Sequence, residues 1–224
     1  MNPHFTHVVL RTTDVDGARA FYGELFDLAQ LDIVPLHEQA IRNGAPPHWL
    51  GFVGPVDVER SVAAFVSRGG ARLGPTVTRN GAKFAVLRDP GGAVLAFTDR
   101  AAEVRGPEML WHHLDASDVD DALATYRDVL GWRATEEREL DGVGVMQEFA
   151  FEHDSVGSMH AVASRGVHPQ WLHHFRVPST DRALALLRAH SCRIFDERTV
   201  PGGDRIVIAD DVQGAAVVFR ERAR

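Results

Sequence analysis

The sequence predicts an α+β protein made of two tandem halves, each with two modules in which a strand is followed by a helix and further strands. Two observations lead to this fold class. The chain repeats its own pattern at two fixed spacings, and strand-like and helix-like segments follow in the same order within the repeats. A chain of 224 residues can form one large domain or two small ones, so the repeats decide between these alternatives.

The evidence for the repeats is two pairs of matching segments, one pair at each spacing. Asp14-Val-Asp16 recurs as Asp118-Val-Asp120, which is 104 residues later. His48-Trp-Leu50 recurs as Gln170-Trp-Leu172, which is 122 residues later. Two independent spacings indicate that each half contains two units that were both copied.

The repeats also set the expected domain boundaries. The 122-residue shift places residues 89–97 on residues 211–219, so the similarity covers nearly the whole chain. We therefore expect a first domain over residues 1–102 and a second one over residues 107–224. Only residues 28–47 separate the first predicted helix from the second module, so the first module is expected to be shortened.

Periodicity assigns a strand and a helix to the start of each module. Residues 5–10 are rich in strand-forming residues. Thr13 or Asp14 can cap a helix over residues 15–26, where apolar residues recur at i, i+3 and i+4. Residues 83–97 read as a hairpin around Asp89-Pro-Gly-Gly92, because Pro fixes φ and Gly permits positive φ in a turn. The second half repeats this order.

Composition and charge exclude several classes of partner. The chain has 24 Lys and Arg, 31 Asp and Glu, and a net charge of −7, with no basic cluster, so we expect no nucleic acid partner. No apolar run approaches the roughly 20 residues of a membrane helix, and no signal peptide is recognisable, so we expect no membrane association. Cys192 is the single cysteine, which fits a reducing compartment, and we expect a cytoplasmic protein.

Two motifs carry a resemblance to a known family. A module opens with HVVLRTTDVDGARAFY and closes with RDPGGAVLAF, and together these resemble the vicinal-oxygen-chelate superfamily of glyoxalases, bleomycin-resistance proteins and dioxygenases. More narrowly, PPHWLGFVGPVDVERSVAAF and LWHHLDASDVDDALATYRDVLGW resemble two-domain bacterial members related to the mycobacterial 27-kDa antigen type. The resemblance implies tandem βαβββ modules that form two half-open barrels, with a small-molecule site in the concave face.

The resemblance also implies where a metal would be bound. In metal-using members, a His from the first strand of a module and a Glu from the last strand bind the ion. His7 stands at the first-strand position of the first half, but Trp111 stands there in the second half. Ala96 and Val218 stand at the two Glu positions, and neither side chain can bind a metal. We therefore expect the family metal site to be missing and no cofactor to be required.

A displaced site in the second domain is the alternative. Strand alternation places Trp111 and His113 on one face of their strand. The resemblance and this alternation together give the expected ligand pocket, which consists of Trp111, His113, Glu148, His160, His174 and His7. If a divalent metal (Zn, Fe, Mn, Ni or Mg) is bound, we expect its ligands to be His113, His174 and Glu148, with His160 as the alternative to Glu148.

The sequence leaves three classes of function open. The first is a protein that binds a small organic molecule in a barrel pocket without a metal. The second is an enzyme: a metal-dependent lyase, isomerase or dioxygenase that uses the displaced site, or a metal-free one that uses His as acid or base. The third is a protein with a filled barrel that serves assembly. The chain is expected to be a monomer with paired internal domains or a homodimer.

Overall fold

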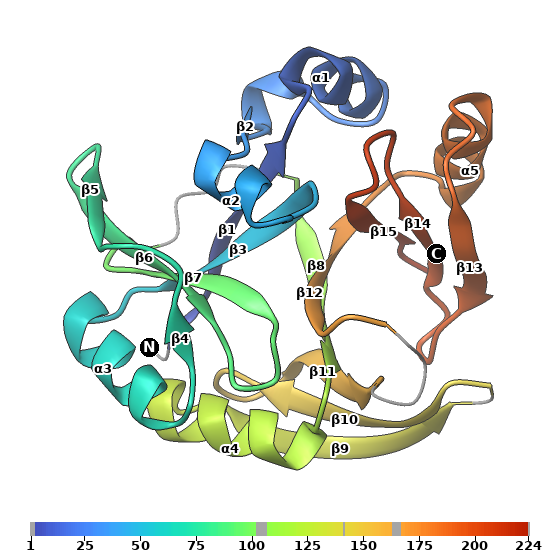
Figure 1. Cartoon of the computed structure of the whole chain (residues 1–224). Helices are drawn as coiled ribbons and strands as arrows, with labels where there is room; N and C mark the ends of the chain where they lie inside the picture. Colours follow the sequence, from blue (N-terminus) through green and yellow to red (C-terminus); the bar gives the residue numbers. More distant parts are fainter. Residues whose placement is uncertain (1–2, 102–106, 141, 163–166, 224) are drawn as a thin grey trace. The chain divides into compact units, whose positions relative to one another are not determined.

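The computed structural model describes residues 3–101, 107–140, 142–162 and 167–223. Its strands form two sheets, and the helices lie between consecutive strands of the chain (Figure 1). The strands of the first sheet are β1 (His4–Thr12), β2 (Ile33–Pro35), β3 (His48–Gly54), β4 (Ala71–Arg72), β5 (Val77–Arg79), β6 (Ala82–Arg88) and β7 (Val94–Thr98). Their order is β2-β1-β3-β7-β6-β4, and β5 pairs with β6.

The second sheet has eight strands in the order β13-β14-β15-β12-β8-β11-β10-β9. These are β8 (Met109–Ala116), β9 (Arg133–Leu140), β10 (Gly144–Ala150), β11 (Ser155–Ala161), β12 (Gln170–Arg176), β13 (Ile194–Thr199), β14 (Arg205–Asp210) and β15 (Ala216–Glu221). The two curled sheets of βαβββ-type modules confirm the predicted α+β class and its tandem half-barrels.

The helices begin where the sequence places capping residues. They are α1 (Val15–Gly23), the 3₁₀ helix η1 (Leu28–Gln30), α2 (Glu38–Arg42), α3 (Val58–Ser67), α4 (Val119–Leu130) and α5 (Thr180–Ala189). The Asp14 carboxylate accepts a hydrogen bond from the Gly17 backbone N–H at 2.9 Å, and Asp118 does the same for Asp121. These side chains satisfy backbone donors that the first helical turn leaves free.

The modules differ in how many strands follow the helix. Three strands follow α4 and three follow α5, in the βαβββ order. Between α1 and β3 the chain instead forms β2, which pairs in parallel with β1, and the short helix α2. The first module therefore has fewer strands than the others.

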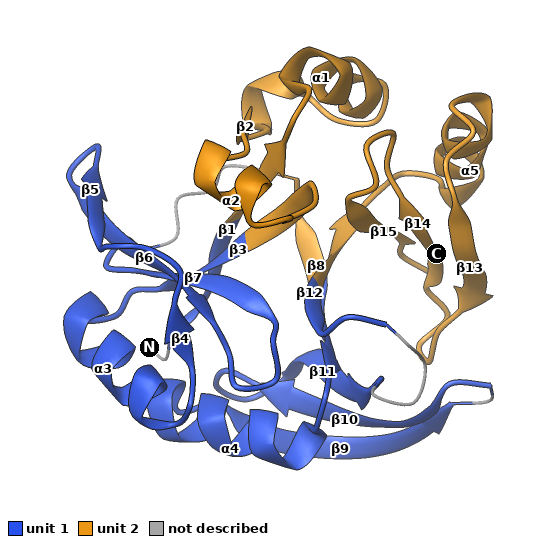
Figure 2. Cartoon of the chain, in the orientation of Figure 1, with its two compact units in different colours: residues 1–7, 51–104, 111–171 blue, residues 8–50, 105–110, 172–224 orange. Residues whose placement is uncertain are grey.

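The chain divides into two compact units, and each unit draws on both halves of the sequence (Figure 2). Unit 1 comprises residues 1–7, 51–104 and 111–171, and unit 2 comprises residues 8–50, 105–110 and 172–224. The boundaries at residues 102 and 107 describe the sequence repeat, and as domain boundaries they stay a prediction. No helix in the described part of the chain is long and apolar enough to cross a membrane.

Each unit has a buried hydrogen-bonded network between its modules. In unit 1 the Tyr126 hydroxyl donates to Asp89 Oδ2 at 2.9 Å, and Trp171 Nε1 donates to the Tyr126 oxygen at 3.1 Å. Burial raises the pKa of the Tyr126 hydroxyl and that of the Asp89 carboxyl. The network joins α4 to the β6–β7 turn. Its counterparts in unit 2 are Tyr22, by the 104-residue shift, and Asp211 and Trp49, by the 122-residue shift. The Tyr22 hydroxyl donates to Asp211, and Trp49 Nε1 donates to the Tyr22 oxygen.

Candidate functional site

The polar residues that the sequence analysis singled out in the second half converge on three neighbouring strands, β8, β11 and β10. Strand β11 runs parallel to β8, and Ser158 lies opposite His113 in this pair. Strand β10 runs antiparallel to β11, and Glu148 lies opposite Ser158. Directly opposed residues share one face of a sheet, so His113, Ser158 and Glu148 form a row across it.

The other face of the same three strands is covered by α4. Phe149 stacks on Trp132 at 5.1 Å between ring centroids, and Trp132 stacks on Tyr126 of α4 at 5.1 Å. Gly157 faces the same side, because a Cβ atom there would lie 2.4 Å from the Phe149 ring. Alternation along the strands therefore turns the row of His113, Ser158 and Glu148 away from α4.

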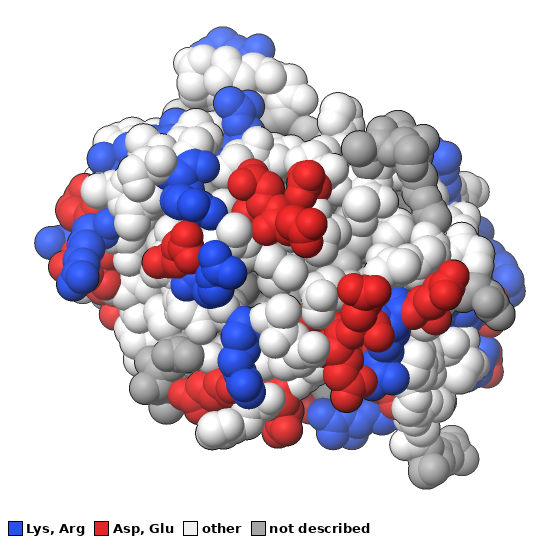
Figure 3. All heavy atoms as spheres, turned by 90° about the horizontal axis from the view of Figure 1, so that it is seen from below, with Lys and Arg blue, Asp and Glu red and all other residues white. Residues whose placement is uncertain are grey.

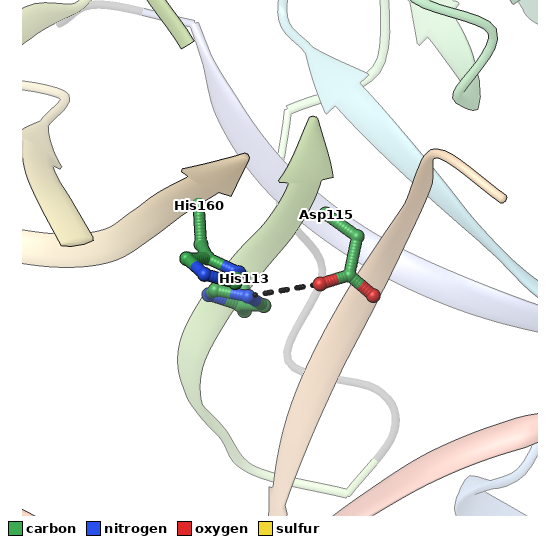
Figure 4. Close-up of side chains that lie close together, drawn as sticks. All are labelled: His113, Asp115 and His160. Carbon is green, nitrogen blue, oxygen red and sulfur yellow. Dashed lines mark hydrogen bonds and ion pairs between the residues drawn. The ribbon is translucent and has the colours of Figure 1, made fainter. Parts of the chain in front are cut away.

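His113, Asp115 and His160 form a compact cluster on this face (Figure 4). One possible ligand atom of each residue lies within 4.8 Å of the others. His113 Nε2 is 3.3 Å from Asp115 Oδ1, and the side chains of these two residues are 12% and 13% exposed. His113 and Asp115 come from β8, and His160 comes from β11, where it lies opposite Asp115.

Hydrogen bonds around the cluster orient both imidazole rings. His160 Nε2 lies 2.9 Å from the Val143 carbonyl, which can only accept, so this nitrogen carries a proton and leaves Nδ1 as the basic nitrogen. His113 Nδ1 lies 2.9 Å from Ser158 Oγ, which leaves Nε2 directed at Asp115.

Two further residues hold the partners of the cluster in place. Trp111 Nε1 donates to Ser158 Oγ at 3.0 Å. Gln170 Nε2 donates to Asp115 Oδ2 at 3.4 Å. Ser158 is 1% exposed, so water does not compete for its hydroxyl. The carboxylate and both rings therefore have fixed directions.

The side chains of His113, Asp115 and His160 suit a divalent ion better than the residues that stand at the family's ligand positions. Two ligand atoms at about 2.0–2.1 Å from a tetrahedral ion lie roughly 3.3 Å apart, which is the separation of His113 Nε2 and Asp115 Oδ1. Both His rings have a second hydrogen bond of the kind that orients metal-binding imidazoles. Trp111, in contrast, stands at the family's first-strand position and offers no lone pair.

The remaining predicted site residues have other surroundings. Glu148 Oε1 accepts from Arg138 Nε at 2.7 Å, so its carboxylate is already paired. His7 stacks on Phe52 at 4.3 Å between ring centroids, and its Nδ1 lies 2.9 Å from the Thr6 hydroxyl.

His174 lies in the other compact unit. It belongs to β12, where it is buried and lies opposite Val218 of β15. The structure thus brings Trp111, His113 and His160 together and places Glu148 in the same row of the sheet. The set of His113, His174 and Glu148 as metal ligands stays a prediction.

Two residues of the site, Asp115 and Ser158, were not among the expected ones. Asp115 could have been found, because it lies two residues after His113 and therefore shares its face of the strand. Ser158 has no such signal. Its place beside His113 depends on the pairing of β11 with β8, which the sequence does not state.

Charged side chains are mixed on the face drawn in Figure 3. There, Lys and Arg side chains are interspersed with Asp and Glu side chains. That face thus lacks the continuous basic area that phosphate backbones require, as far as its described residues show. The absence of a nucleic acid partner stays a prediction for the whole chain.

Comparison with family models identifies the second half of the chain. Residues 111–219 match the model of the Glyoxalase/Bleomycin resistance protein/Dioxygenase superfamily. The second half of the chain belongs to this superfamily. The resemblance drawn from the opening and closing motifs is thereby confirmed, whereas the narrower likeness to the 27-kDa antigen type stays a prediction. A search of the curated proteins finds no match.

Solved structures of the superfamily share the fold over the whole chain. The Mn(II)-bound glyoxalase from Novosphingobium aromaticivorans has a TM-score of 0.65 at 15% identity, covering 98% of this chain and 82% of its own. The 2,3-dioxygenase LapB from Pseudomonas sp. KL28 has a TM-score of 0.63 at 11% identity, covering 99% of this chain and 92% of its own. At such identities the likeness shows the glyoxalase/dioxygenase fold, and the chemistry must be argued from the site.

Proposed function

We propose that this protein binds a small organic molecule on the face of β8, β11 and β10, and that His113, Asp115 and His160 hold a divalent ion to which the molecule binds through oxygen. The single observation that carries the proposal is the cluster of two imidazole nitrogens and one carboxylate oxygen within 4.8 Å. Such a donor set suits iron, manganese or zinc, whereas Mg²⁺ prefers oxygen ligands alone.

The ion would supply a Lewis acid that polarises an oxygen atom of the bound molecule. The chain's own residues prepare the site for it. Ser158 holds Nδ1 of His113, which directs Nε2 toward Asp115, and the Val143 carbonyl leaves Nδ1 of His160 as the basic nitrogen. Because these partners are buried or belong to the backbone, the donors need little reorganisation on binding.

Trp111 supports the binding of a small and flat molecule beside the cluster. It lies two residues before His113 on the same strand, so both side chains face the same way. Its side chain is half-buried, and its Nε1 is anchored on Ser158. A fixed indole ring offers a planar apolar wall against which an aromatic or conjugated ligand can stack.

A metal-free function is the second candidate, and a separate observation supports it. The 3.3 Å contact between His113 Nε2 and Asp115 Oδ1 is a His–carboxylate pair, an arrangement that general acid–base catalysis uses. In that state the Ser158 hydroxyl donates to His113 Nδ1, and His113 Nε2–H donates to Asp115. The same face would then bind its ligand without an ion, as first expected from the missing family ligands.

Metal-binding measurements distinguish the two candidates. Protein stripped with a chelator and dialysed against Mn(II), Zn(II) or Co(II) is expected to retain one ion per chain, measured by elemental analysis and isothermal titration calorimetry. Asp115→Asn and His160→Gln are expected to weaken binding by more than the roughly 10–100-fold typical of outer-shell partners. Glu148→Gln is the matched control, because its carboxylate is paired with Arg138.

The outcomes lead to different conclusions. Metal binding that survives Asp115→Asn but is lost in Glu148→Gln would replace the proposed ligand set with the one expected from sequence. No retained ion in the wild type would reject the metal and leave the His–carboxylate pair. Small-molecule binding is read from the visible spectrum of the Co(II) protein with oxalate, pyruvate and catechol as probes. A spectrum that none of them changes would reject binding of such molecules through the ion.

A further inference from the structure

Gln170, the first residue of β12, contacts the carboxylate of the candidate cluster. Its Nε2 lies 3.4 Å from Asp115 Oδ2, and both residues belong to unit 1. An ionised carboxylate can only accept, so the carboxamide presents its NH₂ group to Asp115. The other oxygen, Asp115 Oδ1, lies 3.3 Å from His113 Nε2. The two oxygens of this carboxylate therefore have different partners on different strands.

The internal repeat places different chemistry at the matching positions of the first half. The 104-residue shift places Asp115 on Arg11. The 122-residue shift places Gln170 on His48, whose Nδ1 lies 2.9 Å from the Pro46 carbonyl. The pair of a glutamine and a carboxylate is thus not required by the architecture that both halves share. It accompanies the cluster in the second half.

The number of Asp115 oxygens that bind an ion decides how much of the ion stays open. An aspartate can bind a metal through one oxygen or through both. His113, Asp115 and His160 supply three donor atoms when one oxygen of Asp115 takes part. Three protein donors leave a further coordination position for water or for a bound molecule. A second Asp115 oxygen would compete for that position.

We propose that Gln170 is a positioning residue that keeps Asp115 Oδ2 off the ion and so leaves a coordination position for the small molecule. The inference rests on the proposed function, because it concerns the ion held by the cluster. The Nε2–H group holds Oδ2, whereas Oδ1, on the side of His113, stays available as the donor. Hydrogen bonds from outside the ligand set orient metal-binding carboxylates in this way.

Gln170→Leu tests this role, because it removes the carboxamide and keeps a side chain of similar size. The stripped proteins are loaded with Co(II), whose visible absorption weakens as its coordination number rises. We expect a weaker absorption in Gln170→Leu, because the second Asp115 oxygen joins the ion. Co(II) affinity, measured by competition with a chelator, is expected to rise or to stay within about threefold of the wild type. Oxalate binding to the Co(II) protein, measured by calorimetry, is expected to weaken by at least about tenfold.

Two further variants and a stability measurement separate this role from general damage. Gln170→Ala also lacks the carboxamide and is expected to give the same changes as Gln170→Leu. Gln147→Leu is the matched control, because the Gln147 carboxamide bonds the backbone carbonyls of Glu136 and Glu148. It is expected to keep the Co(II) spectrum and the oxalate affinity of the wild type. Urea denaturation of the stripped proteins shows whether each variant folds.

The outcomes distinguish this inference from the proposed function. Co(II) and oxalate affinities that fall by the same factor in Gln170→Leu would show only general support of the cluster and would overturn the inference. An unchanged spectrum together with an unchanged oxalate affinity would overturn it as well, and both results would leave the ion in place. A wild-type protein that retains no Co(II) would reject the proposed ion, and this inference with it.

Discussion

Replacing Ser158 with alanine tests how the candidate site is held together. The Ser158 hydroxyl accepts from Trp111 Nε1 at 3.0 Å and lies 2.9 Å from His113 Nδ1, and the residue is 1% exposed. Ser158→Ala therefore removes the hydroxyl that accepts from the Trp111 indole N–H and one of the two contacts that orient the His113 ring. Water does not replace either hydrogen bond, because residue 158 is buried.

The expected magnitudes follow from these two bonds. Loss of an outer-shell partner typically weakens metal binding by about 10–100-fold, which is about 1.4–2.7 kcal/mol. A buried donor that loses its acceptor destabilises the fold by about 1–3 kcal/mol. We therefore expect a lower Co(II) and Zn(II) affinity together with a lower free energy of unfolding in the metal-free state.

Two assays and one control variant test the reasoning. Metal affinity is measured by competition with a chelator, and the free energy of unfolding by urea denaturation of the stripped protein. Ser155→Ala is the control, because Ser155 lies on the same strand but bonds to Thr135 at 2.7 Å, away from His113. If Ser158→Ala lowers stability but leaves the metal affinity within twofold of the wild type, Ser158 does not orient His113 and the reasoning is refuted.

Two further predictions concern buried groups outside the cluster. Tyr126→Phe removes the hydroxyl that joins Asp89 and Trp171, and urea denaturation is expected to show a loss of about 2–4 kcal/mol; a loss below 1 kcal/mol would contradict the network. Burial lowers the pKa of His173 from 6.5 to about 3. Between these two pH values His173 is therefore protonated in the unfolded chain and neutral in the folded chain. Stability should therefore fall as the pH drops below 6.5, by about 1.4 kcal/mol per unit down to about 3, and this slope should be absent in His173→Leu.

Local signals predicted the elements of the fold well. The sequence predicts Thr13 or Asp14 as the cap of the first helix, and Asp14 caps it by accepting from the Gly17 backbone N–H. The turn after β6 was expected from its Asp-Pro-Gly-Gly sequence, and the Asp89 carboxylate bonds the backbone N–H groups of Gly92 and Ala93 there. Each of these features depends on residues within four positions of one another, so the sequence contains the information.

The assembly of the modules could not be predicted in the same way. Tyr22 hydrogen-bonds Asp211, which is 189 residues away, and Tyr126 hydrogen-bonds Asp89 across the linker. These contacts arise from packing between modules of different halves, and no local sequence pattern indicates which modules pack together. The candidate site could be predicted only in part for the same reason. His113 and His160 are recognisable as possible metal ligands from their residue type, whereas Ser158 lies beside His113 only because of the register between β11 and β8.

A displacement of two residues along a strand explains how a metal site could persist when its family ligands are gone. Successive side chains point to opposite faces of a sheet, so a shift of one residue would move a ligand into the core under α4. A shift of two residues, from Trp111 to His113, keeps the face and moves the donor by roughly 7 Å along the strand. Asp115 lies two residues further on the same face and completes the set with His160. The ion would then lie beyond Trp111, which the resemblance places at the family's first-strand ligand position. The metal-binding chemistry would thus move along β8 without any change in the fold.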